Sequence, residues 1–263
     1  MKHEYRFSDF MAIILCCFLF IGNTAAANAE EEAAARYENK QYKEALDIWY
    51  RLVQSGNTGA GIYYNIGVAE SMLQNTSKAV LAFEKAVRFK PSDQKITEAL
   101  TRERKKIEGG TTALPVFFLT RWLQGLSSLL RPGYWAMLGL AVFLIYILRV
   151  IRFKDTRLIT RVRERNIVFG MLTAGVVFIA LAGYAYQRIY RADEAIVVTP
   201  CEFRRAPSED SPQIRSLFPG EKVIVSDQIG DWYHVNLLNL DDGWVKSDFL
   251  EFIIIDGVKP AGG

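Results

Sequence analysis

Cysteine and histidine are the side chains best suited to nucleophilic attack or metal binding, and this sequence has few of either. Cys16 and Cys17 lie in an apolar N-terminal run with His3 before them, so Cys201 and His234 remain once that run is removed. The Cys201 thiol could form a mixed disulfide or a dimer, or could simply be a small residue near a strand edge. A single histidine without cysteine neighbours argues against a zinc site, and His234 is expected to face solvent.

Other catalytic patterns are also missing from the sequence. It has no phosphate-binding glycine loop, no metal-ligand spacing and no pairing of cysteine with histidine. We therefore expect no catalytic residues, no metal, no cofactor and no enzymatic activity.

Aromatic and acidic residues near the C-terminus are better candidates, and they indicate binding rather than catalysis. Tryptophan rings with acidic side chains beside them favour cationic or proline-rich ligands. The alternative is that the second tryptophan belongs to the core and the acids are solubilising turn residues. The candidate binding residues are Asp227, Asp231, Trp232, Asp241, Asp242 and Trp244.

These residues lie in a segment that alternates like short β-strands between Pro, Gly, Asp and Asn turns. We expect a small all-β barrel over residues 192–257. The spacing of this segment resembles that of bacterial SH3 domains, in which the second tryptophan and neighbouring loops line a shallow groove. The residues that carry the resemblance are Leu217, Gly220, Val223, Val225, Trp232, Val235 and Gly243-Trp244-Val245. The expected strands are residues 195–198, 223–225, 232–235, 243–245 and 249–252.

Residues 30–108 show helical patterns with an internal period of 34 residues. Tyr42, Ala45, Trp49 and Leu52 recur as Thr76, Ala79, Phe83 and Ala86. The period resembles that of tetratricopeptide repeats, so we expect two repeats of a short α-solenoid. A capping helix would follow, with Ser92 as its N-cap, and a partner or a second copy would complete the solenoid.

In tetratricopeptide proteins the first helix of each repeat lines a concave groove that binds peptides. The groove implied here is aromatic and mildly acidic, without a Lys or Arg to hold a C-terminal carboxylate, so the expected ligand is an apolar or basic segment. The alternative is that several of these residues merely pack between helices. The groove residues implied by the resemblance are Glu30, Tyr37, Tyr64, Asn65, Val68 and Ser71.

The most apolar part of the chain separates the helical region from the barrel. Uncharged runs at 134–148 and 167–187 predict transmembrane helices over residues 133–151 and 167–187. Residues 149–165 carry seven Lys or Arg against two acids. A short basic loop stays in the cytoplasm, so residues 152–166 are expected there. The alternative, two core helices of a soluble domain, would need other apolar surface to cover them.

The segments before the spans are consistent with this topology. Residues 1–29 have a basic start, an apolar core and Ala27-Asn28-Ala29, as a cleavable signal peptide does. If uncleaved, the leader would form a third span and leave the outward placement unchanged. Residues 113–131 predict an amphipathic helix at the membrane surface, because Arg121 near its middle opposes insertion.

The chain is thus expected in a bacterial inner membrane, with both soluble domains periplasmic and the lipid bilayer as one partner. Residues 192–263 carry six basic against thirteen acidic side chains. The one basic cluster is the short loop, which lies against lipid headgroups, so nucleic acid is not an expected partner.

The full order is a signal peptide, tetratricopeptide repeats, a membrane hairpin and an SH3-like barrel, which makes a multidomain α plus β fold. This order resembles the BatE family of the bacterial aerotolerance (Bat) operon over nearly the whole chain. The resemblance implies a non-enzymatic scaffold in a stress-tolerance complex with von Willebrand A-type membrane proteins, a MoxR-type ATPase and other Bat-operon products. An alternative is an envelope sensor whose SH3-like domain binds peptidoglycan peptides.

Overall fold

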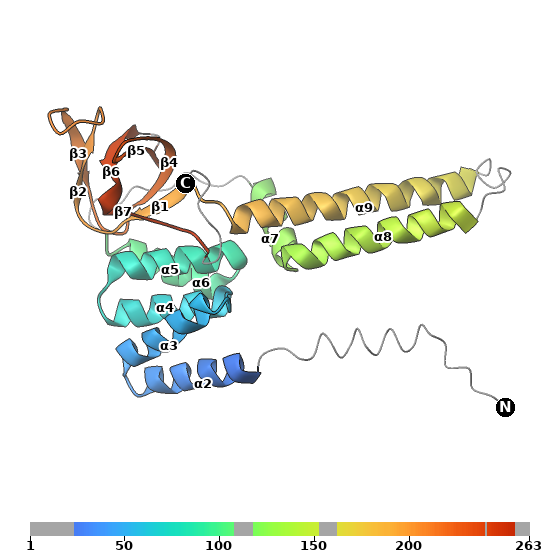
Figure 1. Ribbon diagram of the computed structural model, residues 1–263, viewed down its shortest axis with the longest axis horizontal. Helices are drawn as coiled ribbons and strands as arrows, with labels where there is room; N and C mark the ends of the chain where they lie inside the picture. Colours follow the sequence, from blue (N-terminus) through green and yellow to red (C-terminus); the bar gives the residue numbers. More distant parts are fainter. Residues whose placement is uncertain (1–23, 108–117, 153–161, 240, 256–263) are drawn as a thin grey trace. The chain divides into compact units, whose positions relative to one another are not determined.

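The computed structural model describes residues 24–107, 118–152, 162–239 and 241–255 (Figure 1). These residues form helices and one antiparallel sheet. The chain divides into two compact units, residues 1–57 and 58–263. Most of the predicted signal peptide and the centre of the predicted basic loop lie outside the described residues.

The first unit contains helices α2 (Thr24–Glu38) and α3 (Tyr42–Gln54). Trp49 on α3 is buried, and the Tyr37 ring lies 6.3 Å from it and 5.3 Å from Tyr42, measured between ring centroids. Helix α2 begins before the proposed cleavage site at Ala29, so cleavage would remove its first turn and a half. Cleavage itself stays a prediction.

The second unit begins with helices α4 (Ala60–Met72), α5 (Thr76–Phe89) and α6 (Gln94–Arg104). Helix α4 packs closely on α5 at Gly67 because glycine has no Cβ atom. An added Cβ would lie 2.6 Å from Cε1 of the buried Phe83 ring. The N-cap of α6 is Asp93, whose carboxylate accepts hydrogen bonds from the N–H groups of Lys95 and Ile96. The expectation that Ser92 caps this helix was therefore wrong.

The turns after α2 and α4 have the same backbone geometry, 34 residues apart. Lys40 has φ 61° and Gln74 has φ 62°, both in the left-handed region. The Lys40 N–H donates to the Tyr37 carbonyl at 2.9 Å, and the Gln74 N–H donates to the Ser71 carbonyl at 3.1 Å. The next N–H in each turn donates five residues back, which completes the same helix-ending motif twice. The backbone therefore has the period that the sequence pattern indicates.

Helices α7 (Phe118–Ser128), α8 (Pro132–Arg152) and α9 (Val162–Ile189) form the apolar part of the chain. Residues Asn166–Ile189 of α9 are long and apolar enough to cross a membrane. Helices α7 and α8 meet the same criterion only as a pair, and they are bent by 81° where they join. Helix α9 begins five residues before residue 167, inside the segment predicted as the basic loop.

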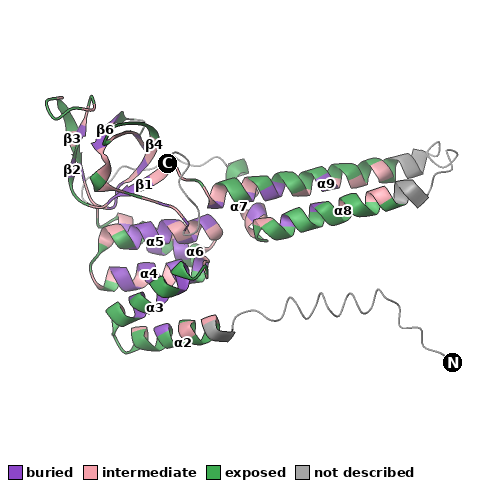
Figure 2. Ribbon diagram, in the orientation of Figure 1, coloured by how far each residue is buried: buried purple, intermediate pink, exposed green. Residues whose placement is uncertain are grey.

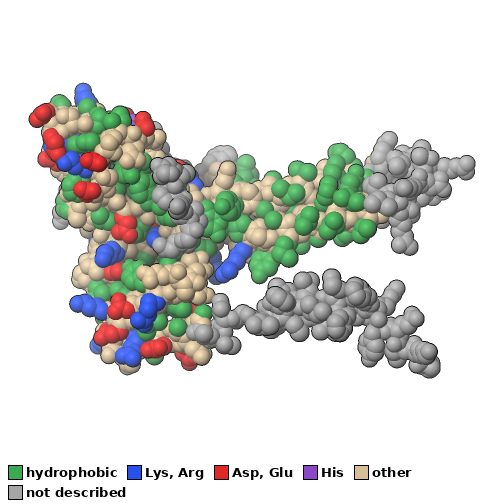
Figure 3. Space-filling model, viewed as in Figure 1, with side chains coloured by type: hydrophobic (Ala, Val, Ile, Leu, Met, Phe, Trp, Pro, Cys, Tyr) green, Lys and Arg blue, Asp and Glu red, His purple; other side chains and the backbone are tan. Residues whose placement is uncertain are grey.

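Helices α8 and α9 lie side by side as a hairpin (Figure 1). They approach closely at Gly139, where a Cβ atom would lie 2.9 Å from Ile179 Cγ1 and 3.3 Å from the Gly175 carbonyl oxygen. Large apolar side chains such as Leu140 and Phe169 remain exposed on the outside of the hairpin (Figures 2 and 3). An apolar outer surface is what a lipid environment requires.

Helix α7 is tied to the end of this hairpin by polar contacts. The Arg188 guanidinium donates to the Gln124 carbonyl at 2.8 Å and to the Ser127 hydroxyl at 2.9 Å. The Trp135 indole N–H donates to the Ser127 carbonyl at 3.3 Å. Ser127 is one of the last four residues of α7, so the helix itself leaves its carbonyl without a donor, and the Trp135 indole supplies one.

The C-terminal part is a curled, seven-stranded antiparallel sheet in the order β3-β2-β6-β5-β4-β1-β7 (Figure 1). Its core contains Phe203, Leu217, Val223, Val235 and Val245. Five strands were expected, and β2 and β3 were missed. The strands are β1 (Glu194–Val197), β2 (Cys201–Arg204), β3 (Gln213–Leu217), β4 (Lys222–Ile229), β5 (Trp232–Leu237), β6 (Asp242–Lys246) and β7 (Leu250–Phe252).

The barrel packs against α5 through apolar side chains on β1 and after β7. Ile196 and Ile253 are fully buried in a cluster with Val80, Phe83 and Leu100 of the helices. Gly220, at φ 97°, leaves room for the Ile107 side chain, whose Cδ1 would lie 2.7 Å from an added Cβ. The helical and barrel parts of the second unit thus share one apolar core.

A network of buried charges surrounds this apolar contact. Lys222 Nζ on β4 lies 3.1 Å from Glu84 Oε2 on α5 and 2.8 Å from Glu194 Oε2 on β1. Arg88 on α5 lies 3.0 Å from the same Glu194 oxygen and donates to the carbonyls of Ile189 and Arg191. The network therefore joins α5, the end of α9 and the barrel.

The pKa values of the network reflect the pairing of its charges. Burial works against ionisation of Glu194, yet Lys222 and then Arg88 hold the pKa of Glu194 below its usual value. Burial likewise opposes the charge on Lys222, but Glu84 and Glu194 raise the pKa of Lys222. Both groups are therefore held in their charged forms.

We predict that Gly67→Ala lowers the thermal unfolding midpoint of the full chain, followed by circular dichroism at 222 nm. The added methyl group overpacks the Phe83 ring, which costs about 1–3 kcal/mol, and the gain in helix propensity returns at most about 1 kcal/mol. Gly61→Ala on the same helix is the matched control, because its Cβ would meet nothing within 4 Å. An equal midpoint for the two variants would contradict the close contact.

The charge network predicts a stability plateau with a loss at each end of the pH range. Because the folded pKa of Glu194 is lowered, its contribution is complete above its unfolded pKa and disappears as pH falls through the folded value. Because the folded pKa of Lys222 is raised, its contribution is complete below its unfolded pKa and disappears as pH rises through the folded value.

Glu194→Gln should therefore lower the unfolding midpoint at neutral pH and reduce the loss on acidification. Glu251→Gln, at an exposed position of β7, is the control and should behave as the wild type. The measurement is a series of thermal melts from acid to alkaline pH. If the unfolding midpoint of Glu194→Gln falls on acidification as much as that of the wild type, Glu194 does not cause the acid loss of stability.

Candidate functional site

The strand register places aromatic side chains together on the outer face of β4, β5 and β6. Trp232 on β5 lies opposite Lys246 on β6, and His234 lies opposite Trp244. Successive side chains of a strand point to opposite faces, so these four lie on the face opposite the buried Val235 and Val245. We call Ile229, Trp232, His234, Trp244 and Lys246 the aromatic face.

His234 is held in place by three neighbours on this face. Its Nδ1 lies 2.8 Å from the Ser226 hydroxyl and its Nε2 lies 3.3 Å from Asp242 Oδ2. Its ring centroid lies 4.9 Å from that of Trp244. Ser226 reaches the ring because the register between β4 and β5 shifts at this point. His234 was expected to face solvent, and it does lie on the outer face; these three neighbours cover most of its side chain, which keeps 25% of its surface exposed.

The Ser226 hydroxyl, the His234 imidazole and the Asp242 carboxylate have the residue types of a hydrolytic triad. Ser226 Oγ, however, also lies 3.2 Å from the His234 carbonyl oxygen, so its proton has two competing acceptors. We interpret the three residues as a support that orients the imidazole against Trp244. Among the described residues, no group of three His, Cys, Asp or Glu side chains could hold a metal ion.

The predicted acidic residues lie around the aromatic face and are all exposed. Asp242 contacts His234, and Asp227 is the register partner of His234 on β4. Asp231 lies in the tight turn between β4 and β5, next to Gly230 at φ 56°. Asp241 lies in the turn before β6. Asp227 and Asp242 thus lie beside His234 on the aromatic face, whereas Asp231 and Asp241 lie in the turns at the two ends of β5.

Lys246 belongs to the same face and was not predicted. Its Nζ lies 5.6 Å from the centroid of the Trp232 ring, and it forms an ion pair with Glu209 from the segment between β2 and β3. The hydrogen bond to Glu209 raises the pKa of Lys246. Alternation along β6 from Trp244 would have found Lys246.

The predicted groove residues on α4 are largely engaged within the helices. The Tyr64 ring lies 5.7 Å from Phe83, and Lys95 Nζ lies 4.7 Å from the Tyr64 centroid. The Ser71 hydroxyl donates to Glu103 on α6. Val68 packs against the core shared with α5, and Asn65 is half-buried.

In the first unit, Glu30 is exposed on α2, while Tyr37 packs with the aromatic rings described above.

Cys201 is a free thiol in the interior of the barrel, with 7% of its surface exposed. Burial, and then the nearby charge of Glu221, raises the pKa of Cys201 to about 12, and Arg215 only partly opposes this. A thiol in this state is a poor nucleophile at physiological pH.

A comparison with protein families matches residues 202–251 to the bacterial SH3 domain. The match confirms the resemblance for this segment, which contains β2 to β6 and the aromatic face. Bacterial SH3 domains are modules that bind proteins or peptidoglycan. The comparisons with curated proteins and with solved structures gave no match.

We predict that Cys201 reacts very slowly with a maleimide at pH 7 in the folded chain and rapidly in urea. The reason is that the thiol is buried and fully protonated at that pH. The extent of labelling is measured by mass spectrometry of the peptide that contains Cys201. Rapid labelling without denaturant would contradict the packing of β2.

Proposed function

We propose that this chain is a non-enzymatic, membrane-anchored scaffold whose SH3 domain binds protein partners through the aromatic face. The single observation that carries the proposal is that one edge of the barrel is docked on the helices while the aromatic face remains open to other molecules. Lys222 at the start of β4 is used to dock the barrel on α5, whereas Ile229, Trp232 and Trp244 retain exposed surface. The family match supports a binding role for this segment.

The chemistry of the aromatic face favours a cationic or proline-rich segment. Tryptophan rings attract a cation above their faces, and Lys246 already lies above Trp232 within the chain. The exposed acids Asp227, Asp231, Asp241 and Asp242 add a negative rim. An arriving lysine or arginine would find both an aromatic wall and nearby carboxylates.

The membrane part of the proposal extends the observation on α9. We propose two spans, α8 and α9, with the basic loop in the cytoplasm and both soluble regions in the periplasm. The repeated turns at Lys40 and Gln74 support a tetratricopeptide solenoid as the second binding module. The order of segments supports a place in a Bat-type complex with von Willebrand A-type membrane proteins.

The second candidate is an envelope sensor that binds peptidoglycan peptides with the same barrel. It is favoured by the family match, because bacterial SH3 domains include peptidoglycan-binding modules. Sedimentation of the purified chain with cell-wall sacculi separates the two candidates. Co-sedimentation that Trp244→Ala abolishes would support the sensor, and the absence of co-sedimentation would support the scaffold.

The scaffold is tested by quantitative affinity purification of the full chain from membranes. We expect Trp232→Ala with Trp244→Ala to reduce recovery of specific partners at least about tenfold, since aromatic anchors dominate such interfaces. Ile214→Ala on β3 is the control, because Ile214 is an exposed apolar residue outside the aromatic face. Circular dichroism verifies the fold of each variant. An unchanged partner list in the tryptophan variant would refute the proposal.

A further inference from the structure

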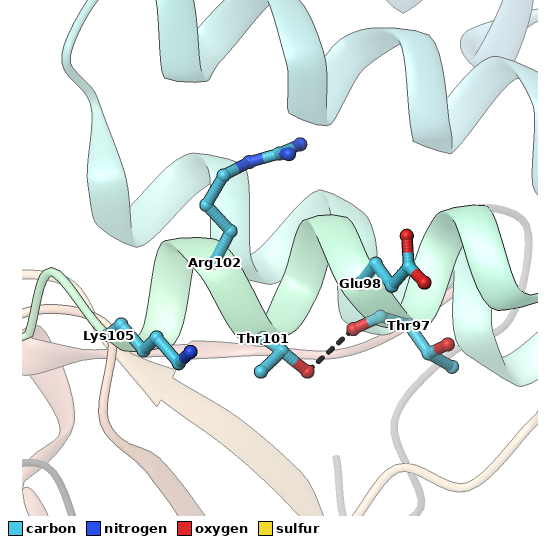
Figure 4. A pocket seen from close by; sticks show the side chains of 5 residues that line it. All are labelled: Thr97, Glu98, Thr101, Arg102 and Lys105. Carbon is cyan, nitrogen blue, oxygen red and sulfur yellow. Dashed lines mark hydrogen bonds between the residues drawn. The ribbon is translucent and has the colours of Figure 1, made fainter.

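Helix α6 carries a cleft that the sequence analysis did not anticipate. Five side chains of this helix line a hollow of about 410 Å³ (Figure 4). The Thr101 hydroxyl donates to the Thr97 carbonyl at 2.7 Å, so that the two threonines form a continuous polar edge. The lining residues are Thr97, Glu98, Thr101, Arg102 and Lys105.

The 34-residue period shows which surface this is. The positions 34 residues before the lining residues are Tyr63, Tyr64, Gly67, Val68 and Ser71 on α4. On α4 that surface is covered, because Phe83 of α5 packs on Gly67 and the α6 residue Glu103 binds Ser71. On α6 the equivalent surface is the cleft, and all five of its residues are polar or charged.

The charges in the cleft are not neutralised in the way that the other charges of α6 are. Lys95 lies over the Tyr64 ring, Arg104 pairs with Glu84, and Lys106 pairs with Glu103. Arg102 and Lys105 are exposed and have no ion pair among the residues that the structure describes.

The cleft also contains one acid, Glu98, which accepts a hydrogen bond from the neutral Gln94 amide at 2.6 Å, so its two cations exceed its acids by one. Residues 102 and 105 are three apart on a helix, so their side chains are neighbours on one face. They can therefore meet the carboxylates of one ligand together.

We propose that the cleft on α6 binds an acidic peptide segment of a protein partner. The planar guanidinium of Arg102 suits a carboxylate, Lys105 supplies a second positive charge, and the threonines border them with polar surface. If this surface of α6 packed against another helical hairpin, it would carry apolar residues such as Tyr64 and Val68. The change to polar residues, with two cations against one acid, favours an acidic ligand.

The proposed ligand differs from the apolar or basic segment expected for the groove of α2 and α4, because the cleft lies on α6. The site is also separate from the aromatic face, which favours ligands of the opposite charge.

The experiment uses the full chain in a nanodisc of neutral lipid and a fluorescein-labelled peptide of alternating Glu and Ser. Fluorescence anisotropy should show binding that weakens with salt, and a peptide with Lys in place of Glu should bind at least about tenfold more weakly. Arg102→Glu with Lys105→Glu should reduce affinity for the acidic peptide at least about tenfold. Lys78→Glu with Lys90→Glu makes the same change in charge at exposed positions outside the cleft and should bind as the wild type.

Arg102→Gln with Lys105→Gln tests the same contacts without charge reversal and should also lose affinity. Trp244→Ala should leave acidic-peptide binding unchanged, so a failure of the aromatic-face proposal does not affect this one. Equal losses in the cleft variant and the control variant would overturn the site. Capture of vesicles containing anionic lipid, without binding of the peptide, would overturn the peptide ligand and indicate lipid headgroups.

Discussion

The buried charges between α5 and the barrel constrain the rest of the second unit. Glu84, Arg88, Glu194 and Lys222 are largely withdrawn from water, and a buried charge without a partner is strongly unfavourable. Lys222 reaches Glu84, and Arg88 reaches Glu194, only if β1 and the start of β4 lie against α5. Because Arg88 also donates to carbonyls at the end of α9, the same contacts connect the barrel to the apolar hairpin.

This arrangement determines which surfaces are left for other molecules. The docked edge of the barrel is occupied by its own chain, while the aromatic face at the far end of β4 keeps its exposed rings and acids. Helix α6 leaves a second surface of opposite charge, where Arg102 and Lys105 lack partners within the described residues. The proposed scaffold would therefore have one face for cationic ligands and one for acidic ligands, and could hold two different segments without competition between them.

The parts of the fold that repeat or alternate were predictable from the sequence. The 34-residue period, the two apolar runs and the tryptophan motifs each depend on neighbours along the chain. Strands β2 and β3 were missed because they are short and carry Arg204 and Arg215 among few apolar residues. The charge network was missed because Glu84 and Lys222 are 138 residues apart, and each alone is typical of a solvated helix or strand face. The contact of His234 with Ser226 was missed because it depends on the register shift between β4 and β5, which alternation along one strand does not reveal.

The most direct test of the docked barrel is a distance measurement by electron spin resonance. Spin labels are placed at the exposed positions Lys78 on α5 and Ser216 on β3, in a full chain whose own cysteines are replaced by alanine. The buried ion pairs and the shared apolar core predict one narrow distance distribution. A broad distribution in the otherwise unaltered chain would show that the barrel moves freely from α5, and would contradict the account.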